Sequence, residues 1–407
     1  MRSVEEHLQL LLGGVSPLSP FDVPLLDARG CVLAESVDAP WPLPPFDNSA
    51  MDGYAVRSLD VAGASPTAPI ELRVVDDVPA GHRATAPVTP GTAVRIMTGA
   101  PMPLGADAVV PVEQTDAGTS VVRIAAGAVA GQFVRVAGGD VDAGARVLDP
   151  GLTLTPRQLA LLAAVGRGRV VVHPRPRVVV ISTGSELVEP GGPLEPGLIP
   201  DSNSATIASA AQEAGAIVYR VGPVTDDAST LLAALEDQLV RADLVVTTGG
   251  VSAGAYDTVK EVLSALGTVE FAKVAMQPGM PQGHGVLGPE STPIVTLPGN
   301  PVSAYVSFEV FVRPMIRRMA GHTQLFRPTV TAAVSRGFAS PAGKMQFARG
   351  VLSVQEGRYV VDPVDGQGSH MLGGLAAANA LVVVPPHVAA MQPGDRLVVL
   401  DLSRDPA

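Results

Sequence analysis

The pattern of apolar and polar positions divides the chain into segments of different kinds. Residues 3–12 and 156–165 have apolar residues at helical spacing. Each opens on a capping pair, Ser3 with Glu6 and Thr155 with Gln158. Between them lie short β-runs with Gly/Pro turns: ELRVV, TAVRIM, DAVVPV, VVRIA and QFVRV. This pattern predicts a β domain inserted between two helices, which we expect to pack against each other.

From residue 176 onward, apolar runs alternate with helical segments. The runs are at 177–182, 216–221, 244–246 and 293–297, and the helices are expected at 205–214, 229–241, 258–266 and 302–320. This alternation predicts a parallel, doubly wound sheet. After residue 329 the β-runs return, as TVTAAV, YVVDPV, ALVVVP and DRLVVL. We interpret them as a small C-terminal barrel, so the fold class is multidomain α/β plus β.

Composition excludes several classes of protein. The 407 residues carry a net charge of −11, which argues against nucleic-acid binding. No apolar run reaches the ~18 residues of a membrane span, and the acidic N-terminus is unlike a signal peptide. Cys31 is the only cysteine, and the seven histidines have no metal-binding spacing. We therefore expect a cytoplasmic protein without a disulfide and without a protein-held zinc or iron site.

Small residues gather in loops that follow predicted strands of the α/β segment. Ligands bind at the carboxyl ends of strands in open parallel sheets, so the convergence of such loops predicts an anion site. A single loop of this kind could equally be a plain strand-to-helix turn. The loops are 182–186, 247–254 and 298–301, and their candidate ligand-binding residues are Thr183, Gly184, Ser185, Gly249, Gly250, Ser252, Gly254, Pro298, Asn300 and Pro301.

Charged residues lie beside these loops. Asp201 and Asp227 precede helices, and we interpret both as N-caps. Glu186 and Asp257 would place negative charge near an anion pocket, which a bridging Mg²⁺ would relieve. Lys273 either neutralises a phosphate or oxyanion or is a solvated surface lysine.

The β segment contains four further polar candidates. Asp52, Thr98, Arg135 and Asp140 stand in SAMDGYA, RIMTGAP and FVRVAGGD. Considered alone they look like ordinary turn residues, and the sequence does not connect them to the α/β site.

Taken together, these motifs resemble one family. The stretches PPFDNSAMDGYA, RIMTGAPMPLGADAVVPVE, STGSEL, IPDSNS, TTGGVSAGAYD, KVAMQPG and LPGNPVSA occur in order between residues 44 and 304. As a set they are similar to the molybdopterin molybdenumtransferases of the MoeA type, which are related to the gephyrin E-domain.

The resemblance implies a division into four domains and an elongated homodimer. The domains would be a discontinuous helical and extended linking domain (1–45 and 141–175), an inserted β domain (46–140), a three-layer molybdopterin-binding α/β domain (176–326) and a C-terminal β-barrel (327–407). Each active site would lie between subunits, so that the partner chain supplies the residues of the β domain.

The implied reaction inserts molybdenum from molybdate into adenylylated molybdopterin and releases AMP, with Mg²⁺ required. Contacts with a molybdopterin adenylyltransferase and with cofactor-accepting enzymes are implied too. Matching positions suggest Glu186 and Asp257 as metal ligands and Arg349 and Ser369 as molybdate contacts. Arg135 is carried over as a substrate-binding residue, beside the acids of the β segment. The catalytic set carried over is Asp52, Thr98, Asp140, Glu186, Asp226, Asp257 and Lys273.

The chain departs from the family pattern at two positions. Gln277 and Met280 stand where many members have lysines, and His284 is the nearby group that could replace the missing charge. Three alternatives remain open: an adenylyltransferase using ATP, a gephyrin-like scaffold without catalysis, and a paralogue for another oxyanion such as tungstate. The extra β segments argue against the first, because that activity needs only the α/β portion.

Overall fold

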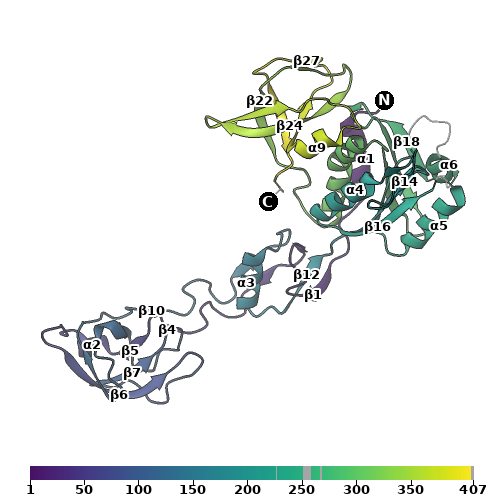
Figure 1. The fold of residues 1–407 in the computed structure, drawn as a ribbon. Coiled ribbons are helices and arrows are strands. Elements are labelled where there is room, and N and C mark those ends of the chain that lie inside the picture. Colours follow the sequence, from purple (N-terminus) through teal and green to yellow (C-terminus); the bar gives the residue numbers. More distant parts are fainter. Residues whose placement is uncertain (226, 251–257, 266–267, 405–407) are drawn as a thin grey trace.

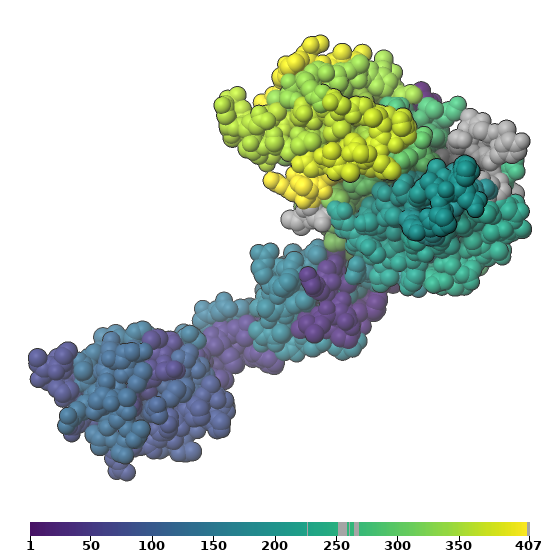
Figure 2. Space-filling view, in the orientation of Figure 1, coloured from purple at the N-terminus to yellow at the C-terminus, as the bar shows by residue number. Residues whose placement is uncertain are grey.

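The computed structural model describes residues 1–225, 227–250, 258–265 and 268–404. The molecule is elongated, with a β module at one end and the α/β and barrel modules at the other (Figure 1). A narrow module containing α3 (Pro156–Ala164) connects them, and the space-filling view shows the same neck (Figure 2). Within the described ranges, no helix has the length and apolar character needed to cross a membrane.

The central sheet has the strand order β16-β13-β17-β21-β20-β18. The first four strands, β16 (Ile217–Val224), β13 (Arg177–Thr183), β17 (Leu244–Thr248) and β21 (Thr292–Leu297), are parallel. This confirms the predicted parallel sheet. The edge pair β20 (Pro281–Leu287) and β18 (Val269–Lys273) was not predicted. Since β20 is antiparallel to both β21 and β18, β18 runs parallel to β21.

Helices cover both faces of this sheet, so its strands are continuously apolar. One face packs against α4 (Ser202–Glu213) and the long segment 301–319, and the other against α5 (Ala228–Leu239) and α6 (Thr258–Ala265). The helix predicted for 302–320 contains a π-helical turn, Phe308–Val312, between α7 (Pro301–Ser307) and α8 (Arg313–Met319). Turns of this kind within α-helices are frequent at functional sites.

The first helix, α1 (Val4–Gly13), packs on the α/β domain. Its predicted capping box is present, with Glu6 N donating to Ser3 Oγ at 3.0 Å and Ser3 N to Glu6 Oε2 at 2.8 Å. Its buried leucines join the core formed with α8 and the π-helical turn. Helix α3 instead packs Leu162 into the connecting module. The expected packing of these two helices on each other is therefore wrong, because an apolar stripe does not specify its partner.

The connecting and β modules consist of short strands from separate parts of the chain. In the connecting module, β1 (Phe21–Pro24), β12 (Arg169–His173) and β2 (Val32–Leu33) pair, as do β3 (Val37–Asp38) and β11 (Arg146–Leu148). The β module has the order β8-β5-β7-β6-β9, with strands Ala108–Pro111, Gly53–Val56, Thr92–Ile96, Ile70–Val78 and Val121–Ile124. The predicted β-runs are present, while the domain boundaries stay a prediction.

The C-terminal segment forms the predicted barrel. Its strands β24 (Met345–Gln355), β25 (Arg358–Pro363), β22 (Thr329–Val334), β28 (Arg396–Asp401) and β26 (Ala380–Val384) follow one another, and β26 pairs back onto β24. This last pairing closes the sheet on itself and removes its free edges. A short strand of the α/β domain, β19 (Met276–Gln277), pairs with β24 and links the two modules.

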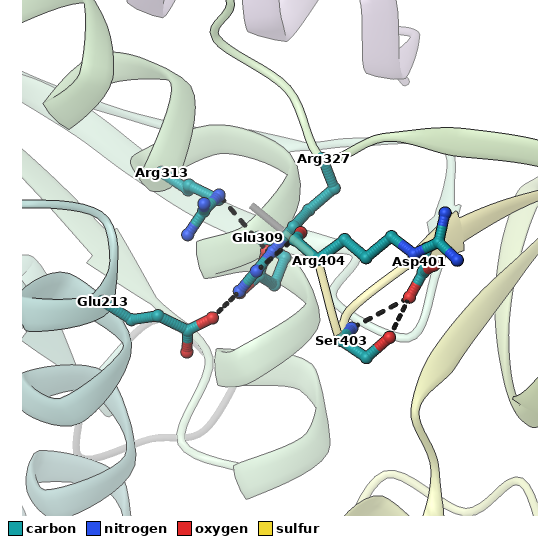
Figure 3. Close-up of polar contacts among 7 residues, drawn as sticks. All are labelled: Glu213, Glu309, Arg313, Arg327, Asp401, Ser403 and Arg404. Atoms are coloured by element: carbon teal, nitrogen blue, oxygen red, sulfur yellow. Dashed lines mark hydrogen bonds and ion pairs between the residues drawn. The ribbon is translucent and has the colours of Figure 1, made fainter. Parts of the chain in front are cut away.

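A buried ion network also joins the barrel to the α/β domain (Figure 3). Arg327, in the connection to the barrel, donates to Glu309 of the π-helical turn at 2.9 and 3.1 Å. It also donates to Glu213 at 2.6 Å and to the Arg404 carbonyl at 3.2 Å. The Arg327 side chain is 2% exposed and that of Glu309 is fully buried. Because buried charges are stable only when paired, this network holds the connection against the α/β domain.

Candidate active site

The predicted loops converge at the carboxyl ends of adjacent strands. Gly249 N donates to the Leu297 carbonyl at 3.1 Å, which joins the end of β17 to that of β21. Thr183 Oγ1 donates to the Thr248 carbonyl at 3.2 Å, which joins β13 to β17. A Cβ on Gly299 would lie 3.5 Å from the Cα of Gly249. The three loops therefore form one surface, as the sequence predicted.

Two glycines allow this close approach. Gly249 has a φ of +95°, and a Cβ there would lie 2.5 Å from the Thr183 carbonyl oxygen. Gly184 has a φ of +151°, and a Cβ there would lie 2.5 Å from Glu186 Oε2. The carboxylate of Glu186 thus lies over the backbone of Gly184, which places an exposed negative charge at the loop surface.

We expect Gly249→Ala to destabilise the protein by about 1–3 kcal/mol, because a side chain there combines a strained φ with a backbone clash. Gly63→Ala is the matched control, since a Cβ at Gly63 meets nothing within 4 Å. Chemical denaturation of both variants measures the difference. Equal stability of the two variants would contradict the close approach of β13 and β17.

Hydrogen bonds below the surface hold the loops in register. Asp201 Oδ1 accepts from Ser182 Oγ at 2.9 Å and from Ser204 N at 3.0 Å, so Asp201 caps α4 as predicted. Asn203 Nδ2 donates to the Gly299 carbonyl at 2.6 Å. The sequence interpretation missed Asn203, although its place in IPDSNS at a helix N-terminus was the available signal. This asparagine connects the start of α4 to the 298–301 loop.

Asp227 caps α5, which confirms its predicted role. Its carboxylate accepts from Thr230 N at 2.8 Å, and hydrogen bonds from Ser229 and Thr230 lower its pKa to about 2. In the 298–301 loop, Pro301 occupies the first turn of α7, and the exposed Asn300 side chain makes no cap bond. Four candidates, Asp226, Ser252, Gly254 and Asp257, lie outside the described residues.

Lys273 lies at the same edge of the sheet as the three loops. Because β18 is parallel to β21, both strands end on this side. Since β20 lies between β18 and β21, these two strands are about 10 Å apart. Side chains alternate along β18, so Lys273 shares the face of Phe271, which packs with the α5 and α6 core. The lysine is exposed, and within the described ranges no ion pair involves it.

The barrel brings Ser369 to the 298–301 loop. Val302 N donates to the Ser369 carbonyl at 3.0 Å. Arg349 is 1% exposed, and its guanidinium donates to the carbonyls of Met371, Gly366 and Gly368 at 2.6, 2.7 and 3.1 Å. Burial lowers the pKa of Arg349. In this structure Arg349 anchors the loop that carries Ser369, while contact of either residue with molybdate stays a prediction.

The candidates of the β module lie far from these loops in the same chain (Figure 1). Thr98 N donates to Asp52 Oδ1 at 2.6 Å, and this hydrogen bonding lowers the pKa of Asp52. Arg135 pairs with Asn48 in the strand register, and the exposed Asp140 donates its N–H to the Leu43 carbonyl at 2.9 Å. The fold therefore brings Asp52 to Thr98 but brings none of the four to the α/β loops.

His284 does not replace the missing lysine charge. Its ring lies on the α1 side of the sheet, 5.3 Å from the ring of His7, and its Nε2 is 3.7 Å from Glu270 Oε2. Burial lowers the pKa of His284. A neutral imidazole in this position supplies no positive charge for an oxyanion, so that suggestion from the sequence is wrong.

Among the described residues, no group of three or more His, Cys, Asp or Glu side chains could hold a metal ion. The exposed carboxylate of Glu186 beside glycine loops fits a different kind of site. Mg²⁺ is commonly held by one or two carboxylates together with ligand phosphates and water.

Comparisons with known proteins cover nearly the whole chain. The MoeA N-terminal region (domain I and II) matches residues 2–166, the "Probable molybdopterin binding domain" matches 179–318, and the MoeA C-terminal region (domain IV) matches 331–402. Molybdopterin molybdenumtransferase 2 of Mycobacterium tuberculosis (strain CDC 1551 / Oshkosh) is 48% identical, covering 99% of this chain and 100% of its own. Molybdopterin molybdenumtransferase of Bacillus subtilis (strain 168) is 36% identical, covering 93% of this chain and 89% of its own.

The solved structure of the molybdopterin biosynthesis moea protein from Pyrococcus horikosii has the same fold. It superposes with a TM-score of 0.80 at 31% sequence identity and covers 98% of both chains. The resemblance inferred from the sequence motifs is thereby confirmed. The chain belongs to the molybdopterin molybdenumtransferase family.

Proposed function

We propose that the protein inserts molybdenum from molybdate into adenylylated molybdopterin and releases AMP. The observation that carries the proposal is the joining of three glycine-containing loops at one edge of the α/β sheet, with Glu186 over Gly184 and Lys273 at the same edge. Such a surface offers backbone N–H groups and one cation to a phosphate-bearing ligand. Family membership supports the choice of substrate.

In this proposal the groups of the α/β domain bind and stabilise the negative charge of the substrate phosphates. Backbone N–H groups of the loops orient the phosphates, and Lys273 offsets charge that develops as the phosphate link breaks. Glu186, with Asp257 outside the described residues, would hold Mg²⁺, which when bound stabilises phosphate charge as a Lewis acid. Molybdenum is a substrate in this reaction, and the product molybdopterin carries it.

We also propose that two chains assemble each site as a homodimer. The separation of the β module from the α/β domain supports this, because the β segment carries Asp52, Thr98, Arg135 and Asp140 (Figure 1). In a dimer with two-fold symmetry, the β module of one chain can reach the α/β domain of the other, and both sites are then equivalent.

Complementation between inactive variants tests this shared site. Asp52→Asn keeps an acceptor for Thr98 N but loses its charge, and Glu186→Gln loses the loop carboxylate. We expect each variant alone to be inactive. A 1:1 mixture after subunit exchange should recover about a quarter of the wild-type activity, because half of the sites in half of the dimers are intact.

The matched control mixes Glu186→Gln with Lys273→Ala. Both lesions lie in the α/β domain, so every site in the mixed dimer stays defective, and the activity should not rise above that of the two variants measured separately. Absence of recovery in the Asp52→Asn mixture, in a sample where subunit exchange is verified by mass, would contradict the shared site. The assay is molybdate-dependent release of AMP from adenylylated molybdopterin.

We place the protein in the cytoplasm, in contact with a molybdopterin adenylyltransferase and with cofactor-accepting enzymes. A free adenylylated intermediate passes most directly between enzymes that touch.

Incubation with molybdopterin, ATP and Mg²⁺ separates the proposed reaction from adenylyl transfer, since release of pyrophosphate would support the adenylyltransferase instead.

A further inference from the structure

We propose that the N-terminal clip, defined as Arg2 with Glu270, positions Lys273 for the reaction. This inference rests on the proposed function of Lys273. It assigns Arg2 and Glu270 a role that acts through the backbone of β18.

Lys273 ends the edge strand of the sheet, where one side of the backbone has no neighbouring strand within the described part of the sheet. Residue 2 occupies that side. Arg2 N donates to the Lys273 carbonyl at 3.0 Å, and Ala275 N donates to the Arg2 carbonyl at 2.8 Å. This forms a parallel bridge between Arg2 and Val274. The backbone that carries the lysine is therefore held by the start of the chain.

The Arg2 side chain fixes this bridge in register. Its Nη2 donates to Glu270 Oε1 at 2.7 Å, three residues before Lys273 on the same strand. Its Nη1 lies 3.4 Å from His7 Nδ1 on α1. Burial lowers the pKa of His7 to about 3, so the imidazole is neutral and can accept this hydrogen bond. Arg2 thus joins α1 to β18.

The barrel holds the same segment from the other direction. Met345 N donates to the Ala275 carbonyl at 2.9 Å, and Met276 and Gln277 pair with the start of β24. The segment 273–277 is consequently held at successive backbone groups by the N-terminus and by the barrel. Lysine has a long side chain with much rotamer freedom, so a fixed backbone is what sets the reach of its ammonium group.

A role in stability alone explains these contacts less well. The Glu270 side chain is 56% exposed, and ion pairs that are this exposed contribute little to folding. What the clip does fix is the position of the backbone next to Lys273. Small displacements of a charge-stabilising group reduce the rate of reaction while the substrate still binds.

Two variants of one residue separate the contributions. Arg2→Ala removes the ion pair, and Arg2→Pro also removes the N–H that donates to the Lys273 carbonyl. We expect Arg2→Pro to lower kcat about 10-fold with little change in KM, and Arg2→Ala to have a smaller effect of the same kind. Glu71→Gln is the control, because the Glu71 side chain is 57% exposed, close to the 56% of Glu270, and forms a cross-strand pair with Arg123 at 2.9 Å in the β module.

A double-mutant cycle with Lys273→Ala provides the readout that a merely structural role would not change. If the clip acts through Lys273, Arg2→Pro has no further effect on kcat in the Lys273→Ala background. Hydrogen exchange of peptides covering residues 270–280 should also accelerate in Arg2→Pro and stay unchanged in Glu71→Gln.

The outcomes are distinguishable. If Lys273→Ala lowers kcat and Arg2→Pro does not, the positioning role is wrong and the proposed function stands. If the two effects are additive, the clip acts on something other than Lys273, and the inference fails. If Lys273→Ala leaves kcat unchanged, the catalytic role of Lys273 is wrong, and the inference fails with it.

Discussion

Replacing Arg327 with methionine should lower the free energy of unfolding by about 3–5 kcal/mol, since removal of one partner leaves an uncompensated buried charge. Glu309 would lose both hydrogen bonds from Arg327, at 2.9 and 3.1 Å, inside a fully buried environment. Burial alone lowers the pKa of Arg327, but Glu309 and Glu213 outweigh it, and the net pKa is raised. The guanidinium therefore stays charged, and the network depends on it.

Arg336→Met is the matched control for this prediction. Arg336 also contacts two carboxylates, Asp362 and Asp365, but its side chain is 47% exposed. We expect a loss below about 1 kcal/mol, as for other surface ion pairs. Urea denaturation followed by a probe in the barrel and one in the α/β domain gives both values. A similar small loss in Arg327→Met would show that the buried network does not hold the barrel in place.

Replacing Glu186 with glutamine should lower the rate of molybdate-dependent AMP release about 10²–10³-fold while leaving the fold intact. Glu186 is exposed and lies over Gly184, so the substitution removes charge without opening a cavity. If Glu186 helps to hold Mg²⁺, the variant should also need a higher Mg²⁺ concentration for half-maximal rate.

Glu189→Gln is the control for the loss of Glu186. Glu189 is exposed three residues further along and pairs with Arg220 at 2.8 Å rather than facing the loops. We expect its activity and its Mg²⁺ dependence to be those of the wild type. Unchanged activity in Glu186→Gln would remove this carboxylate from the proposed metal site and from the reaction.

The sequence predicted the parallel part of the sheet because its strands are apolar without interruption. It did not predict β20, where two glycines break the apolar pattern, or its partner β18, where Glu270 and Lys273 interrupt the apolar residues. The structure shows why the two positions in β20 are glycines: a Cβ at Gly283 would lie 2.9 Å from the Phe271 ring, and one at Gly285 would lie 2.0 Å from the Thr268 carbonyl. Close packing between the two strands therefore requires glycines in β20, and these glycines interrupt the apolar pattern from which a strand is predicted.

The candidate site was only partly predictable from the sequence. Loops after parallel strands must meet at one edge, so their convergence followed from the order of elements. The anchoring role of Arg349 did not follow, because it depends on carbonyls of residues 366–371 that fold back around the guanidinium. Nor did the sequence indicate that Asn203 joins α4 to the 298–301 loop.

The sequence by itself determined the local features of this protein: the helix caps at Ser3, Asp201 and Asp227, the strands of the β module and barrel, and the identity of the glycine loops. These depend on backbone preferences and on contacts within a few residues. Only the tertiary structure decided that α1 joins the α/β core and that Arg2 lies beside Lys273. It also decided that the β module lies far from the loops (Figure 1). Contacts between distant segments depend on which surfaces bury one another, and a pattern along the chain identifies an apolar face without identifying its partner.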